Sequence, residues 1–184
     1  TYHRTDSLNL AEGAIEKARD YINRTYGQEY VPEKPRRFKT NSKMAQEAHE
    51  AIRPTGLDGI DNGKLTMEKD EERLYQLIWK RFVASQMAAA KFDKTNVEVV
   101  AQVAEVEYKL RAEGIKMVFD GWLKVYNGGE EDQILPELNE GEKLKKKEVK
   151  VEQKWTLPPA RFSEATLIKT LEKLGIGRPS TYAP

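Results

Sequence analysis

The sequence predicts an α+β fold in which a helical region is followed by antiparallel β structure and then by a second, shorter helical region. Three observations lead to this prediction. Apolar residues recur at helical spacing as far as about Ala89, they alternate with polar residues between Asp93 and Tyr126, and helical spacing returns after Pro159. These changes of period place a boundary near Lys91–Asp93, and 184 residues are enough for one ordinary domain or two small ones.

The bulk composition limits the classes of function. Of the 184 residues, 33% are charged and 39% are hydrophobic, a polar balance that is typical of part of a larger or elongated protein. A net charge of +1 does not indicate a nucleic-acid partner by itself, although charges can still gather into a local basic surface. The absence of cysteine excludes disulfides and cysteine-bound zinc in this sequence. No apolar run approaches ~20 residues, so no segment is expected to span a membrane, and no signal peptide is recognisable. The sequence starts and stops inside recognisable patterns, so we expect a fragment, and the lack of cysteine fits a reducing compartment such as the cytoplasm.

The first predicted helix spans Leu8 to Tyr26, with Asn9 as its N-cap and Gly27 at its C-terminal end. Its inner face consists of apolar residues at helical spacing, Ala11, Ile15, Ala18, Ile22 and Tyr26. Two prolines then predict an irregular segment from Gln28 to Lys43. The basic residues of this segment surround an aromatic ring, a pattern that suits either a solvated loop or contact with a phosphate backbone: Arg36, Arg37, Phe38 and Lys39.

A short helix is predicted from Met44 to Ile52, ended by Pro54. If its last turn extends to Arg53, then His49 and Arg53 share one helical face, where they could hold a phosphate and move a proton. The alternative is that Arg53 and Glu50 are surface charges and that His49 only makes local contacts.

A longer helix is predicted to start with Thr66 as its N-cap and to run to about Ala89. Its acidic first turns match the positive end of the helix dipole and are expected to form a solvated face rather than a metal site. The expected buried stripe is Leu74, Leu77, Ile78, Phe82 and Ser85. The preceding residues 56–64 are rich in Gly, Asp and Asn and predict a turn-rich connection. They do not predict a calcium-binding loop, because they lack its acidic spacing and its closing Glu.

Alternating residues predict three or four antiparallel strands between Asp93 and Tyr126, with turns at Glu113-Gly114 and Asp120-Gly121. A further strand is predicted from Lys143 to Lys154.

The last residues predict two helices. Ser163 is the expected N-cap of the first helix and Gly175 its end, and Pro179 fits the first turn of the second. The amides and hydroxyls of Ser180 and Thr181 could then face a phosphate near that helix N-terminus.

The first residues of the chain place a phenol beside a cation. Tyr2 is followed by Arg4 and by short polar residues up to Ser7, at a predicted strand-to-helix junction. A tyrosine there could attack a phosphate whose charge is held by the guanidinium fork of Arg4. Because an ordinary tyrosine has a pKa of ~10, the phenol would need a nearby cation or base. The alternative is that Tyr2 is a half-buried packing residue.

Three ordered blocks resemble the type IA DNA topoisomerase family, and most of all its bacterial topoisomerase I branch. They are Tyr2–Ser7, Gln46–Pro54, and Pro158–Glu164 continued by Gly175–Ala183. Residues 119–122 and 134–136 also resemble linking segments of the family, so the likeness covers essentially the whole chain. His3 favours the topoisomerase I branch, because the topoisomerase III branch commonly has proline there. The core of a reverse gyrase remains an alternative.

The resemblance implies that Tyr2 cleaves one DNA strand and keeps its 5′ phosphate as a phosphotyrosine. Arg4 would neutralise the scissile phosphate, and His49 would assist through a hydrogen bond or proton movement. DNA contacts, especially to single strands, are implied for the basic and hydroxyl residues Arg53, Arg161, Ser163, Arg178, Ser180 and Thr181. Residues 1–91 would be a helical lobe that carries the tyrosine, 92–155 part of a β arch, and 156–184 the beginning of a helical strand-binding domain.

The family relaxes negatively supercoiled DNA without ATP, because the phosphotyrosine conserves the energy of the broken bond. The sequence accordingly lacks a Gly-rich ATP-binding phosphate loop. The resemblance implies a monomeric, nucleoid-associated parent that needs Mg²⁺, held by a Toprim domain absent from this sequence, so these residues alone are expected to be inactive. The alternative of a different class is a non-catalytic single-stranded DNA-binding or scaffold module, which the scattered arginines also suit.

Overall fold

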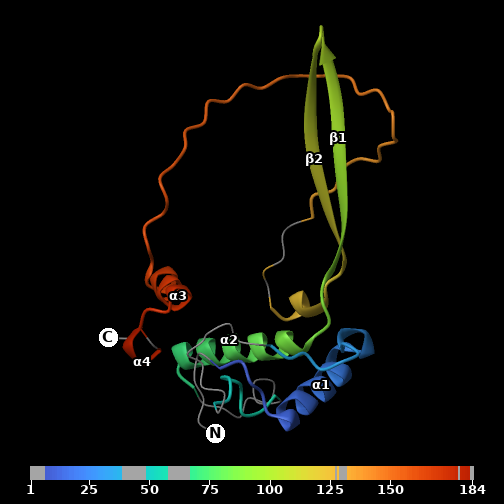
Figure 1. Ribbon diagram of the computed structural model, residues 1–184. Coiled ribbons are helices and arrows are strands. Elements are labelled where there is room, and N and C mark those ends of the chain that lie inside the picture. Colours follow the sequence, from blue (N-terminus) through green and yellow to red (C-terminus); the bar gives the residue numbers. More distant parts are fainter. Residues whose placement is uncertain are drawn as a thin grey trace. The chain divides into compact units, whose positions relative to one another are not determined.

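The computed structural model describes residues 7–38, 49–57, 67–126, 128, 132–177 and 179–182. Within these residues the chain forms four α-helices, two short 3-10 helices and two β-strands (Figure 1), which confirms the predicted α+β class. The chain divides into two compact units, Thr1–Ile134 and Leu135–Pro184. None of the described helices is long and apolar enough to cross a membrane.

Helix α1 (Glu12–Tyr26) confirms the first predicted helix but begins later than expected. Its N-cap is Ala11, whose methyl side chain makes no capping hydrogen bond, so the prediction of Asn9 as N-cap was wrong. The backbone of Asn9 instead accepts a hydrogen bond from Ala51 N at 2.8 Å, which holds Asn9 outside the helix. Gly27 ends α1 as predicted, with a φ of 108° that favours glycine. A short 3-10 helix, η1 (Gln28–Tyr30), follows.

Helix α2 (Lys69–Gln86) is capped by Glu68 and not by Thr66, which lies outside the described residues. Glu68 and Glu71 form a reciprocal capping box, so two acidic side chains replace the hydroxyl that the prediction assumed. Only part of the expected buried stripe is buried. Phe82 is buried, but Leu74 and Leu77 are 58% and 52% exposed, because the buried residues of α2 lie in its C-terminal turns.

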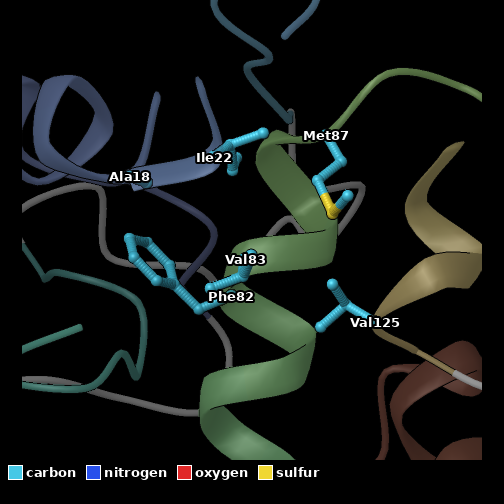
Figure 2. Close-up of a cluster of buried hydrophobic side chains, with 6 residues drawn as sticks. All are labelled: Ala18, Ile22, Phe82, Val83, Met87 and Val125. Atoms are coloured by element: carbon cyan, nitrogen blue, oxygen red, sulfur yellow. The ribbon is translucent and has the colours of Figure 1, made fainter. Parts of the chain in front are cut away.

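The hydrophobic core lies where α1 meets the end of α2. Figure 2 shows Ala18 and Ile22 on α1, Phe82, Val83 and Met87 along and just after α2, and Val125 on a third segment. The buried residues of α1 are Ile15, Ala18, Tyr21 and Ile22, which confirms the centre of its predicted stripe. Contacts between residues about sixty positions apart therefore build this core.

Strands β1 (Lys91–Val103) and β2 (Val106–Phe119) pair antiparallel and form one long ribbon (Figure 1). The prediction of three or four strands between Asp93 and Tyr126 was wrong. Glu113-Gly114 is not a turn, because Gly114 lies within β2 and pairs with Thr95. The reversal occurs at Ala104 instead, whose positive φ of 53° fits a two-residue hairpin loop without the usual glycine or asparagine.

The predicted turn at Asp120-Gly121 is confirmed, since the chain leaves β2 there and enters the 3-10 helix η2 (Gly121–Lys124). Gly121 has a φ of 50°, and a Cβ on it would lie 2.6 Å from backbone atoms of Ala89 and Ala90. The close approach of these two backbones therefore requires glycine.

Two further predictions of regular structure were wrong. Residues 49–53 are not helical, so the predicted helix from Met44 to Ile52 fails over its described end, while residues 44–48 lie outside the described residues. Residues 143–154 form no strand, because a strand needs a partner ladder and none pairs with them in the part of the chain that the structure describes.

In the second unit, helix α3 (Glu164–Leu174) confirms its prediction closely. Ser163 is the N-cap and shares a capping box with Thr166, and Gly175 ends the helix in the left-handed conformation. Helix α4 (Pro179–Tyr182) begins at the predicted proline.

Candidate functional site

The residues predicted to form the site differ in how far the structure describes them. Tyr2, Arg4 and Arg178 lie outside the described residues, as does the side chain of Ser180. His49 and Arg53 lie in the first unit, and Arg161, Ser163 and Thr181 lie in the second.

The residues that follow Tyr2 and Arg4 lie against the segment that carries His49. The buried hydroxyl of Ser7 donates to the carbonyl oxygen of His49 at 2.5 Å. Two residues further along each segment, Ala51 N donates to Asn9 O at 2.8 Å. The two motifs that sequence analysis singled out are thus joined by backbone and side-chain hydrogen bonds, although about forty residues separate them.

A carboxylate adds a third connection between the same segments. Glu50 Oε1 accepts from Ala11 N at 3.1 Å, directly before α1. It also accepts from Arg53 Nε at 2.6 Å, and Glu50 Oε2 accepts from Arg53 Nη2 at 3.3 Å. The two side chains are only 12% and 24% exposed, so this ion pair is mostly shielded from water.

This geometry contradicts the expectation that His49 and Arg53 act together from one helical face. The two residues do not share a helical face, because the backbone between them is not helical. The guanidinium of Arg53 is directed to Glu50 instead, so neither side chain of that pair is a free surface charge. Sequence analysis missed the role of Glu50. The one available signal was the three-residue spacing of a Glu and an Arg before a proline.

The basic loop after η1 is held to the helices at several points. Arg37 forms an ion pair with Glu12 at 2.6 Å, and both side chains are at least 60% exposed. The fully buried Gln86 donates to Arg36 O at 3.2 Å, and Arg19 donates to Pro32 O at 2.8 Å. The loop is therefore anchored through its carbonyl groups, and Lys39 lies outside the described residues.

A phenol and a carboxylate meet where the helices join the ribbon. Tyr30 Oη donates to Asp120 Oδ1 at 2.7 Å, and Tyr30 O accepts from Ala88 N at 2.8 Å. The hydrogen bond to Asp120, together with desolvation and the nearby carboxylate charges, raises the pKa of Tyr30 to about 12. Tyr30 therefore stays protonated at neutral pH and serves as a donor.

In the second unit, the predicted DNA-contacting hydroxyl of Ser163 has a local partner. Its Oγ accepts from Thr166 N at 3.3 Å, and Thr166 Oγ1 accepts from Ser163 N at 2.8 Å. This accounts for Ser163 as a helix cap. Arg161 is exposed two residues before it, and Thr181 is exposed on α4.

The described residues contain no group of three or more His, Cys, Asp or Glu side chains that could hold a metal ion. None of the described residues is therefore assigned as a metal ligand.

Comparisons with a family model and with individual known proteins agree with one another. A family model described as DNA topoisomerase matches residues 1–184. DNA topoisomerase 1 of Pasteurella multocida is 51% identical over 186 residues, which cover all of this chain and 21% of that protein. DNA topoisomerase 1 of Helicobacter pylori is 48% identical over 185 residues, which cover all of this chain and 25% of that protein.

A solved structure agrees with these sequence matches. Full-length topoisomerase I from Thermotoga maritima superposes with a TM-score of 0.80 at 39% identity, over all of this chain and 29% of that one. The chain thus spans between a fifth and a third of the length of the proteins it matches.

Proposed function

Because the chain belongs to the DNA topoisomerase family, we propose that it forms the tyrosine-bearing part of an enzyme that relaxes negatively supercoiled DNA. One observation carries most of this proposal. The segment that follows Tyr2 and Arg4 and the segment that carries His49 are fastened side by side by the bonds from Ser7 and Ala51. This supports a single site that contains all three proposed catalytic residues.

In the proposed reaction, the phenolic oxygen of Tyr2 attacks the phosphorus of one DNA strand. A bond forms between the tyrosine oxygen and the 5′ phosphate, and the bond to the 3′ oxygen breaks. The phenolic proton is released to a nearby base, and the departing 3′ oxygen takes up a proton and leaves as a hydroxyl. Arg4 offsets the charge of the phosphate. His49 assists by hydrogen bonding or proton movement. Religation is the reverse step and needs no ATP, because one ester replaces another.

Mg²⁺ supplies additional positive charge near the cleaved phosphate when it is bound. We expect the acidic residues of a Toprim domain outside these 184 residues to hold it. The first unit would then provide the nucleophile and the second unit the beginning of a groove for single-stranded DNA, lined by Arg161, Arg178, Ser180 and Thr181. The shielded pair with Glu50 and the helix cap give Arg53 and Ser163 structural roles beside the DNA contacts proposed for them. We propose a monomeric, nucleoid-associated parent.

We propose domains that span residues 1–91, 92–155 and 156–184. The β ribbon then lies in the middle domain, of which residues 92–155 form only a part. One face of the ribbon supports this, because its opposed residues Val99 and Leu110, Ala101 and Tyr108, and Val103 and Val106 are apolar. Leu110, Tyr108 and Val103 are between 52% and 62% exposed. A face of this kind is normally covered in a complete domain.

The test is to replace Tyr2 in the full-length protein. Tyr2→Phe should abolish both DNA relaxation and the covalent protein–DNA adduct, with DNA binding unchanged. Both losses would also exclude the alternative of a non-catalytic DNA-binding module, which is indifferent to this change. An adduct that survives Tyr2→Phe would refute the assignment of the nucleophile.

A further inference from the structure

Two Glu–Arg pairs lie near the beginning of α1, and they differ in burial. Glu12 and Arg37 are 63% and 60% exposed, whereas Glu50 and Arg53 are 12% and 24% exposed. Exposed pairs contribute little, because water screens the charges. A shielded pair is different, because the loss of one partner leaves the other charge poorly solvated. The two pairs therefore have different consequences when they are broken.

The carboxylate of Glu50 also takes the place of a helix cap. Ala11 is the N-cap residue of α1 and has no side-chain acceptor. Glu50 Oε1 accepts the backbone N–H of Ala11 and brings a negative charge to the positive end of the helix. A residue about forty positions away thus accepts the N–H of the N-cap residue, a task that the Glu or Gln at the third helical position performs in a capping box.

The residues on either side of Glu50 are fixed by the same arrangement. His49 O receives the hydroxyl of Ser7, and Ala51 N donates to Asn9 O. Arg53, three residues further on, is held by both carboxylate oxygens. Glu50 is therefore the side chain that connects the histidine segment to the start of α1.

We propose that Glu50 is a positioning residue for strand cleavage. Its carboxylate holds the segment from His49 to Arg53 against residues 7–11, which follow the proposed nucleophile, and so keeps the backbone of His49 beside Ser7. This proposal rests on the proposed function, because it assigns a role in that same site. Glu50 contacts neither DNA nor metal in this role and acts only through His49 and Arg53.

The test uses Glu50→Gln in the full-length protein, because glutamine keeps the size of the side chain and removes its charge. Three quantities are measured: the single-turnover rate of adduct formation on a single-stranded oligonucleotide with Mg²⁺, the Kd for that oligonucleotide, and the melting temperature. A displacement of about 1 Å in a catalytic group can slow a reaction by ~100-fold. We expect adduct formation to slow by ~10-fold to ~100-fold, while the Kd changes by less than about threefold.

Glu12→Gln is the matched control, because it removes the exposed carboxylate at the start of the same helix. It should change neither the rate nor the Kd. If Glu50→Gln lowers the melting temperature but leaves the rate of adduct formation unchanged at a temperature where it is folded, Glu50 is only structural and the proposal is overturned. An equal loss in both variants would overturn it as well.

A double variant tests whether Glu50 acts through Arg53. If the two residues act as one unit, Glu50→Gln combined with Arg53→Gln should be within about threefold of the slower single variant. Multiplied losses would mean that Arg53 acts separately, and would contradict the proposed role.

If Glu50→Gln does not fold, Glu50→Asp replaces it. The shorter side chain of aspartate keeps the charge but cannot reach both Ala11 and Arg53, so the same slowing of adduct formation is expected. A wild-type protein that forms no adduct, or a Tyr2→Phe variant that still forms one, would overturn the proposed function and this role together.

Discussion

The helical part of the first unit and its β ribbon reach stability in different ways. In the helices, side chains from distant segments are buried together, and Ala18, Ile22, Val83 and Met87 are 0% exposed. In β1 and β2, almost every residue is partly or fully exposed although the backbone pairing is continuous. The helical part is held by side-chain packing, and the ribbon by its hydrogen-bond ladder.

This difference bears on function. The segment proposed to carry His49 is fastened to helix α2, because Trp79 Nε1 donates to Leu57 O and Tyr75 Oη donates to Gly56 O. The ribbon is divided between an apolar face and a charged face, on which Glu98 pairs with Lys109 and Arg111. The helical part can therefore hold the segment from His49 to Leu57 in place, whereas the ribbon leaves apolar side chains such as Leu110 and Val103 exposed.

The largest difference between the two regions is expected when one side chain is truncated in each of them. Ile22→Ala should lower the free energy of opening of α1 and α2 by about 2–5 kcal/mol, because it leaves a cavity in the core. Arg111→Ala, on the charged face at a side chain that is 81% exposed, should change the opening of the ribbon by less than about 0.5 kcal/mol, because an exposed ion pair such as that with Glu98 contributes little. Hydrogen exchange of the backbone amides in the full-length protein measures both. Similar losses at the two positions would show that the ribbon is packed in the full-length protein as tightly as the helices.

Sequence patterns predicted the fold where local chemistry decides it. Ser163 acts through a hydroxyl that bonds three residues away, Gly175 and Pro179 mark the ends of helices α3 and α4, and all three predictions were confirmed. The patterns failed where a distant partner decides. The backbone of Asn9 accepts a hydrogen bond from Ala51 and lies outside the helix. Leu74 is exposed because the buried residues of α2 lie further along the helix. Ala104 carries no turn signal, so the hairpin was placed at Gly114 instead.

In the candidate site, too, local motifs could be predicted from the sequence, whereas contacts between distant segments could not. The motifs around Tyr2 and His49 could be found from residue types and their order, and family membership agrees with them. The link between these motifs could not be found in this way, because it depends on Ser7 and Glu50 reaching across about forty residues. A serine and a glutamate in polar surroundings have no periodicity that would distinguish them.

A smaller effect is expected where the two regions meet. Tyr30→Phe keeps the ring that lies 4.9 Å from the ring of Phe119 and removes the hydrogen bond to Asp120. This should lower the free energy of opening at the end of β2 by about 1 kcal/mol. The pKa of Tyr30 is raised from 10.0 to about 12, so its contribution is complete below pH 10 and is lost as the pH rises through about 12. The difference between wild type and Tyr30→Phe in hydrogen exchange should therefore shrink over that interval. A difference that grows with pH would contradict the assigned donor.

The smallest effect is expected at the tip of the ribbon. Ala104 has a φ of 53°, a left-handed conformation that costs a non-glycine residue roughly 1–2 kcal/mol. Glycine removes this cost but loses about 0.5–1 kcal/mol through the greater freedom of the unfolded chain. Ala104→Gly should therefore stabilise the hairpin by about 0.5 kcal/mol and slow exchange near the turn about twofold. Because the ribbon is held by its own ladder, the amides of α1 and α2 should be unaffected. If their exchange slows as well, the ribbon and the helices open together, and the two regions form one cooperative unit instead of two.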